Sequence, residues 1–259
     1  MWEVDAAVIG GWLGSFLWPF FRVAGFFMLA PIIGTRLVPG RIRLLFSIFV
    51  TLALVPILPE APLIDSLTIG AFIIIAQQLL IGIAMALILQ VLLQMFVVAG
   101  QLIAMQMGLG FASMMDPANG ISVTVLSQFH LMLVTMIFLS MNGHLAMIEV
   151  LAASFEVLPV GGGFLSNNAM YSIAGWMSWL FAGSLLMAIP AVTSLLVVNS
   201  TLGIITRAAP QLNIFAIGFP FMLLLGLCIV YVTMGNYLPH FDNFTREALD
   251  IMRGILIMP

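Results

Sequence analysis

The sequence contains very little charge. Only 7% of its 259 residues are charged and 63% are hydrophobic, whereas soluble domains are about 25% charged. It has no lysine, so seven arginines supply all of its basic side chains. These shortages exclude an ordinary soluble domain. Because the arginines do not cluster with aromatic residues, they also exclude nucleic acid as a partner.

Cysteine is nearly absent, and motifs for catalysis are missing. The single Cys228 can form neither an internal disulfide nor a cysteine metal site. The three histidines lack HExxH spacing, so we expect them to be hydrogen-bonded structural groups. The sequence also lacks a P-loop, a dinucleotide fingerprint and a GxSxG elbow. We therefore expect no enzyme activity, no metal and no cofactor.

Long apolar runs are what the sequence does contain. About 20 apolar residues cross a bilayer as a helix, and continuous runs favour helices over a barrel. The sequence predicts an all-α integral membrane protein. The N-terminus lacks the basic region of a cleaved signal peptide, so we expect the first apolar segment to remain. The expected segments are Trp12–Gly34, Ile42–Leu58, Ile69–Met107, Val123–Ile148, Ile173–Thr206 and Ile214–Leu238.

The connectors between these segments hold nearly all the charge. Six crossings with the N-terminus outside would place four arginines in the cytoplasm and six acids outside, as the positive-inside rule favours. By parity the C-terminus would also lie outside. The cytoplasmic arginines are Arg36, Arg41, Arg43 and Arg207, and the external acids are Glu3, Asp5, Glu60, Asp65, Glu149 and Glu156.

Two of the segments are too long for simple spans. Ile69–Met107 would be about 58 Å long as a helix, whereas the hydrocarbon core is about 30 Å thick. In the segment Ile173–Thr206, Pro190 predicts a kink or a break. Small residues also predict close helix packing. They are Gly10, Gly11 and Gly14, and the pairs Gly82/Ala86, Ala99/Gly100 and Gly218/Gly226.

A few polar side chains lie inside the apolar segments. Gln90, Gln94 and Gln101 fall within about 40° of one another on a helix. This stripe either lines an aqueous conduit or forms hydrogen bonds with neighbouring helices. Arg22 lies near the centre of the first segment, where a charge indicates a functional or pairing role. An acid in another subunit is one candidate partner, which the sequence does not name.

The stretch "QMGLGFASMMDPANG", within residues 106–121, interrupts the hydrophobic pattern. Gly108 and Gly110 loosen the helix, Asp116-Pro117 disfavours it, and Asn119-Gly120 is a turn signal, so we predict a loop. At membrane depth such a loop must be buried in protein or face a water-filled cavity. Met107, Phe111, Met114 and Met115 would make it soft and apolar, able to close a hole. Physical reasoning leaves this reading and that of a surface connector equally open.

Four blocks of the sequence, in the same order along the chain, resemble the FliR family of flagellar type III export-gate subunits. They are "APIIGTRLVPGRIR" (residues 30–43), "QMGLGFASMMDPANG", "NGHLAMIEVLAASFEVLPVG" (142–161) and "APQLNIFAIGFP" (209–220). The resemblance covers most of the chain.

The resemblance implies one subunit of a helical hetero-oligomeric channel in the bacterial inner membrane, within the flagellar basal body. Several FliP and FliQ copies would complete the channel, and FlhB would bind at its cytoplasmic entrance. Residues 1–165 would be similar to FliP and residues 166–259 to FliQ. The loop 106–121 would plug the closed channel, through which unfolded flagellar proteins pass.

The complex in this family lies mostly above the membrane plane, which puts the six-span topology in question. Three other functions stay open: the homologous virulence-associated secretion gate, a secondary transporter with paired broken helices, and a membrane protease, for which no nucleophile and base can be assigned.

Overall fold

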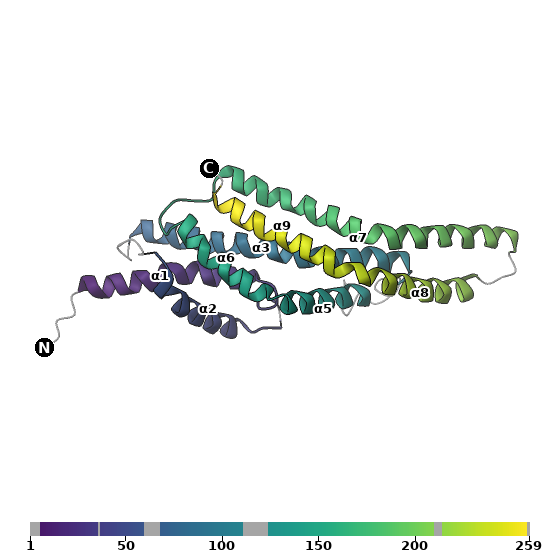
Figure 1. Ribbon diagram of the computed structural model, residues 1–259, viewed down its shortest axis with the longest axis horizontal. Helices are drawn as coiled ribbons and strands as arrows, with labels where there is room; N and C mark the ends of the chain where they lie inside the picture. Colours follow the sequence, from purple (N-terminus) through teal and green to yellow (C-terminus); the bar gives the residue numbers. More distant parts are fainter. Residues whose placement is uncertain (1–5, 36, 60–67, 111–123, 210–213, 258–259) are drawn as a thin grey trace. The chain divides into compact units, whose positions relative to one another are not determined.

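The computed structural model describes residues 6–35, 37–59, 68–110, 124–209 and 214–257, without the side chains of 6–13 and 214–217. Every regular element in these ranges is helical. Figure 1 colours the helices by their position along the sequence. Several helices are long and apolar enough to span a membrane. The prediction of an all-α integral membrane protein is confirmed.

The chain forms two compact units. The first combines residues 1–91, 141–176 and 245–259, and the second combines residues 92–140 and 177–244. Three long helices contribute to both units: α3 (Ile69–Gln106), α7 (Asn167–Ala208) and α9 (Tyr237–Ile257). The division at residue 165, which followed chain order, stays a prediction.

The first unit is built around α1 (Ala6–Leu29) and the first part of α3, with α2 (Gly40–Leu54), η1 (Val55–Ile57) and α6 (Gly143–Val157). Its core contains the fully buried rings of Phe26, Phe27 and Phe155. Phe27 meets Phe46 edge to face with ring centroids 4.9 Å apart, which joins α1 to α2.

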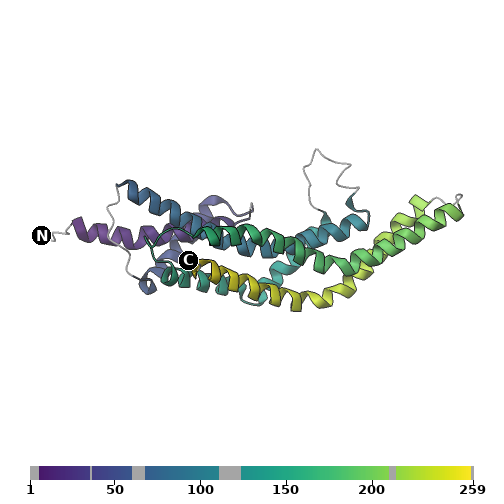
Figure 2. The ribbon, with the colours of Figure 1, turned by 90° about the horizontal axis from the view of Figure 1, so that it is seen from above.

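The second unit contains the rest of α3 and α7, with α5 (Val125–Ser140), α8 (Ile214–Thr233) and η3 (Met234–Asn236). Phe96 of α3 anchors its core, because the ring contacts Tyr237 and Phe241 at centroid distances of 6.0 and 5.6 Å. Helices α7 and α8 lie side by side and antiparallel (Figures 1 and 2).

The membrane-length helices differ from the six expected segments. In the described part of the chain, four helical stretches qualify by length and composition: Gly40–Ile57, Ile69–Gln106, Asn167–Ala208 and Gly218–Leu256. A fifth is obtained if α5 and α6 count as one bent span. The described part of the first expected segment, Gly14–Leu29, is a shorter apolar helix.

One local feature explains part of the difference. The expected segment Val123–Ile148 is broken after Ser140, where Asn142 takes a left-handed backbone with φ of 57°, a conformation that asparagine tolerates better than most residues. At Pro190 a kink or a break is expected from the sequence. The break is wrong, because α7 continues as one α-helix through that proline, and the kink stays a prediction.

Candidate functional site

The beginning of the 106–121 segment is an ordered helix end. Helix α3 ends at Gln106, and Gly108 has φ of 87°, which favours glycine. Backbone amides of Met107 and Leu109 donate to the carbonyls of Ile103 and Ala104, both at 3.0 Å. These bonds satisfy carbonyls of the last turn, as at many helix C-termini.

Met107 is held against α8. Its side chain is 1% exposed, and a Cβ added to Gly226 would lie 2.5 Å from Met107 Cγ. A glycine at position 226 is therefore what lets α8 approach this methionine. The other predicted residues of the segment lie outside the described ranges, except Gly108 and Gly110. They are Phe111, Met114, Met115, Asp116, Pro117, Asn119 and Gly120.

The chain is described again from Thr124, at the start of α5. The Thr124 side chain caps the helix, because its Oγ1 accepts a hydrogen bond from the Ser127 amide at 3.3 Å. Thr124 and Ser127 are 6% and 0% exposed. Buried hydrogen-bonding groups thus hold the chain where it enters α5.

Gln101 of α3 forms hydrogen bonds with both of these residues. Its Oε1 accepts the Thr124 amide at 3.1 Å and the Ser127 hydroxyl at 3.0 Å. Gln101 thus forms hydrogen bonds between α3 and the start of α5, and whether the stripe also lines a conduit stays a prediction. Gln90 and Gln94 are half-buried, and their role stays a prediction.

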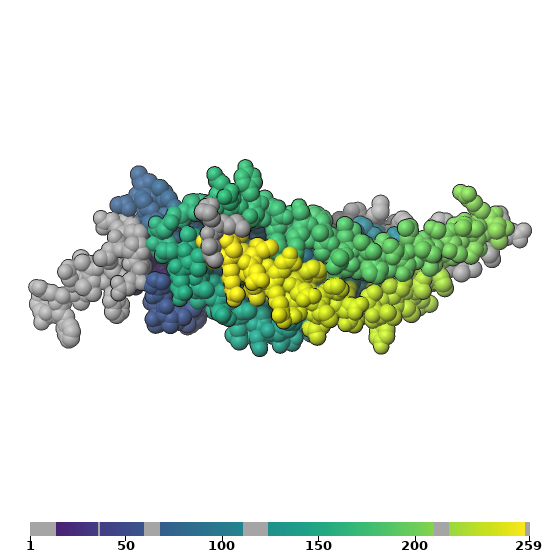
Figure 3. Space-filling view, turned by 45° about the horizontal axis from the view of Figure 1, so that its top comes forward, coloured from purple at the N-terminus to yellow at the C-terminus, as the bar shows by residue number. Residues whose placement is uncertain are grey.

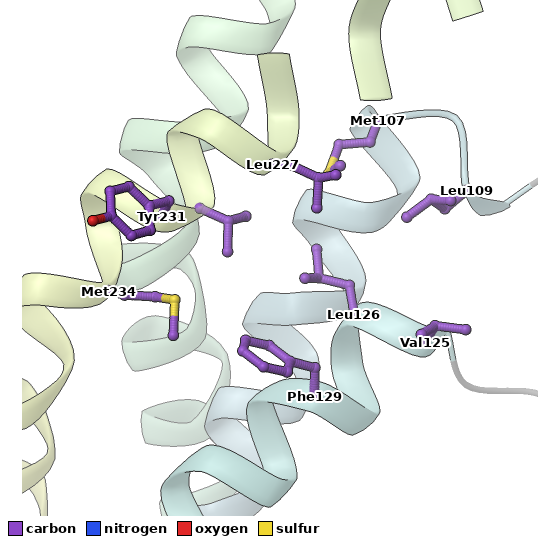
Figure 4. A pocket seen from close by; sticks show the side chains of 9 residues that line it. Met107, Leu109, Val125, Leu126, Phe129, Leu227, Tyr231 and Met234 are labelled. Carbon is purple, nitrogen blue, oxygen red and sulfur yellow. The ribbon is translucent and has the colours of Figure 1, made fainter. Parts of the chain in front are cut away.

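An apolar pocket of about 520 Å³ lies at the same place in the second unit. Figure 4 shows residues from both sides of the 107–124 connection facing residues of α8 and η3. Its lining residues are Met107, Leu109, Val125, Leu126, Phe129, Leu227, Val230, Tyr231 and Met234. Both ends of the connection therefore lie beside one hydrophobic hollow.

His130 extends the buried polar contacts along α5. Its Nε2 shares a hydrogen bond of 2.5 Å with the Tyr237 hydroxyl, and the histidine is fully buried. A Cβ on Gly100 would lie 2.3 Å from His130 Nδ1, so α3 and α5 approach closely here. The expectation of a hydrogen-bonded structural histidine is confirmed for His130.

Arg22 is a fully buried cation of the first unit. Its Nε donates to Gln78 Oε1 at 2.8 Å, its Nη1 to the Ser154 carbonyl at 2.8 Å, and its Nη2 to the Leu158 carbonyl at 2.7 Å. The guanidinium also lies 4.1 Å from the centre of the Phe155 ring. Two of these acceptors are carbonyls at the C-terminal end of α6, where the helix dipole favours a positive charge.

The connector arginines have different surroundings. Arg43 Nε donates to the Val38 carbonyl at 3.1 Å, and its Nη2 donates to the Thr35 carbonyl. Arg41 is exposed, and Arg207 lies in the last turn of α7, a favourable place for a cation. Arg36 lies outside the described residues. Their cytoplasmic side stays a prediction.

Sequence reasoning missed Gln78, Ser154, Thr124 and Tyr237. Gln78 lies in the same apolar helix as the glutamine stripe, so its polar side chain was an equally visible signal. Ser154 and Leu158 contact Arg22 mainly through backbone carbonyls, which residue type does not reveal. Within the described ranges, no group of three or more His, Cys, Asp or Glu side chains could hold a metal ion.

Comparisons with known proteins cover nearly the whole chain. Residues 13–248 match the family described as "Bacterial export proteins, family 1". Flagellar biosynthetic protein FliR of Escherichia coli (strain K12) is 36% identical over 245 residues, which cover 95% of this chain and 94% of that protein. The proteins of the same name from Aquifex aeolicus (strain VF5) and Bacillus subtilis (strain 168) are 31% and 27% identical, each covering 94% of this chain and 95% of the relative.

Proposed function

Because this chain belongs to the family of bacterial export proteins that includes flagellar biosynthetic protein FliR, we propose that it is a subunit of the flagellar type III export gate. It would be a non-enzymatic part of the channel through which unfolded flagellar proteins leave the cell. The observation that carries this proposal is the similarity to FliR along almost the entire chain. Its location would be the bacterial inner membrane, within the flagellar basal body.

In this proposal the channel is completed by FliP and FliQ, several copies each, with FlhB at the cytoplasmic entrance. Exposed apolar faces support an embedded subunit. On α2, Ile42, Leu45, Phe49 and Leu52 are 55, 53, 67 and 53% exposed and recur at spacings of three and four residues, which places them on one helix face. Lipid or a neighbouring subunit must cover this face, since an apolar patch of this kind is unfavourable in water.

The C-terminal part would correspond to FliQ. Helices α7 and α8 form an antiparallel pair, and Arg207 lies just before their connection. A basic residue at the connection favours the cytoplasmic side of a membrane. This agrees with a hairpin whose turn faces the cytoplasm.

The segment 106–121 would plug the closed channel. The described residues on either side of it support this role, because Met107 is buried against α8 and Thr124 forms a hydrogen bond with Gln101. Met107 and Thr124 both belong to the second unit, so the chain enters and leaves this stretch at defined places, which a segment that closes a pore reproducibly requires. Its methionines would form a deformable apolar seal.

Deleting Gly110–Asn119 tests the plug. We expect the variant to assemble normally and the channel to conduct ions, because the plug is what holds back small solutes. Ion conductance of the purified complex in planar bilayers is the measurement. A second variant, with the same residues replaced by a Gly/Ser stretch of equal length, asks whether the apolar side chains are needed. Conductance as low as in the native complex, with the complex intact, would remove the plug from the proposal.

The mass of the complex that co-purifies in mild detergent separates the alternatives. An export-gate subunit should be found in a large assembly with several small membrane proteins. A secondary transporter should purify alone or as a dimer. The virulence-associated gate would form the same kind of assembly, so a knockout is needed to distinguish it. Loss of motility would indicate the flagellar gate, and loss of effector secretion would indicate the virulence-associated gate.

A further inference from the structure

We propose that Gln101 is a positioning residue of the channel, whose side-chain amide fixes where the 107–124 connection returns to the helices. This inference rests on the proposed function, in which part of that connection closes the pore. It concerns a residue that lies outside the plug itself and that would act through the first turn of α5.

The bonds of Gln101 join distant parts of the chain. Its Oε1 accepts two hydrogen bonds, from an amide 23 residues away and a hydroxyl 26 residues away. Thr124 Oγ1 also lies 3.0 Å from Ser127 Oγ. The three side chains therefore form a small connected network at the first turn of α5. Since Thr124 and Ser127 are buried, losing the shared acceptor would leave polar groups without an equivalent partner.

The neighbouring residue makes the position of α5 strict. A Cβ on Gly100 would lie 3.0 Å from Ser127 Cα, so the two backbones are nearly in contact beside Gln101. Three residues further along α5, the His130 bond to Tyr237 holds the same helix face. Close packing at Gly100 fixes the distance between α3 and α5. The side-chain oxygen of Gln101 fixes the position of Thr124, the residue that caps α5.

Apolar packing alone would not do this. Residues around the nearby pocket are aliphatic, aromatic or methionine side chains, which make non-directional contacts and repack easily. A hydrogen bond has a preferred distance and angle. We infer that Gln101 supplies the directional constraint in a part of the molecule otherwise held by apolar contacts.

The test replaces Gln101 with methionine, which keeps the side-chain length and removes the acceptor. We expect hydrogen exchange at the amides of Thr124 and Ser127 to become about five- to tenfold faster. We also expect a higher ion conductance of the assembled complex. The matched control for the exchange measurement is Gln94→Met, on the same helix and half-buried, which should leave exchange at Thr124 and Ser127 unchanged. Gln101→Glu keeps an acceptor oxygen at the same place and should restore slow exchange and low conductance.

The outcomes separate this inference from the proposed function. Native exchange in Gln101→Met would overturn the positioning role, whatever the conductance. Suppose that the Gly110–Asn119 deletion conducts ions and that Gln101→Met shows faster exchange but native conductance. The positioning role would then also be overturned, because the plug would not depend on the Gln101 hydrogen bonds. If that deletion does not leak, the plug proposal fails, whereas the exchange of Thr124 still decides whether Gln101 holds α5.

Discussion

Arg22 illustrates how uncharged groups in the described part of the chain hold a buried cation. The side chain is fully buried, and its described partners are a glutamine, a serine and two carbonyls. A cation at a helix C-terminus is stabilised by the helix dipole and by carbonyls that have no partner within the helix. Arg22 therefore joins α1, α3 and the end of α6 within the first unit.

Replacing Arg22 with methionine should destabilise the protein. The change removes the Arg22 donor from Gln78 and from the Leu158 carbonyl, at roughly 1–3 kcal/mol for each buried group left without a partner. The Ser154 carbonyl still accepts the Leu158 amide. Unfolding by SDS in mixed micelles would measure the loss. Arg41→Met, at an exposed position, is the control and should change the free energy of unfolding by less than about 0.5 kcal/mol.

A double-mutant cycle shows whether Gln78 is the energetic partner of Arg22. Gln78→Leu alone leaves the buried cation with one donor unpaired, whereas the double variant removes both members of the bond. We expect the double variant to lose less stability than the sum of the single losses, by roughly 0.5–3 kcal/mol. Additive losses would mean that the 2.8 Å bond between Arg22 and Gln78 contributes little.

At the scale of the elements, glycine sets how closely helices approach. A Cβ on Gly82 of α3 would lie 2.1 Å from the Arg22 carbonyl of α1 and 2.7 Å from the Phe26 amide. Both contacts are with backbone, which cannot turn aside as a side chain can. Close packing through small residues is how membrane helices associate without a hydrophobic driving force.

Gly82→Ala should therefore push α1 and α3 apart, with a loss of about 1–3 kcal/mol or more. Gly203→Ala is the matched control, because Gly203 lies inside α7 with nothing within 4 Å of an added Cβ. Alanine favours the helix at both positions by about 1 kcal/mol. The control should keep or gain stability, and equal behaviour of the two variants would contradict a packing role for Gly82.

The sequence predicts those features of the helices that depend on neighbouring residues, and it misses those that depend on distant ones. Small residues at Gly82 and Ala86 indicated close packing, and the long apolar run gave α3 to within one residue of its end. The break at Asn142-Gly143 has the same Asn-Gly signal used for residues 119–120, but the apolar run around it concealed the signal. The partners of Arg22 depend on residues 56 and 132 positions away, which no local pattern specifies.

At the scale of the whole molecule, α9 is the part least suited to lipid. It carries Asp242, Arg246, Glu247, Asp250 and Arg253, five of the 17 charged residues of the chain. Figure 3 shows this helix, in yellow, at the surface of the face in view. Four of the five side chains, those at 246, 247, 250 and 253, are exposed. Each ionised group near the bilayer centre costs at least about 2.5–3.5 kcal/mol.

The stretch Gly218–Leu256 has 39 residues, or about 58 Å as a helix, and the hydrocarbon core is about 30 Å thick. Because α8 alone has 20 residues, it can fill that thickness. We therefore expect α8 to cross the bilayer and α9 to extend beyond it. With Arg207 in the cytoplasm, α9 would lie on the opposite side.

Cysteine labelling in spheroplasts tests this placement. Glu247→Cys, in a Cys228→Ala background, should react with a membrane-impermeant maleimide added from outside, because its side chain would face water. Native Cys228 is exposed on α8 and should resist the same reagent, since lipid or a neighbouring subunit would cover it. Arg207→Cys should react only after lysis. If residue 247 also requires lysis, or stays unreactive after it, α9 does not extend into the external aqueous phase.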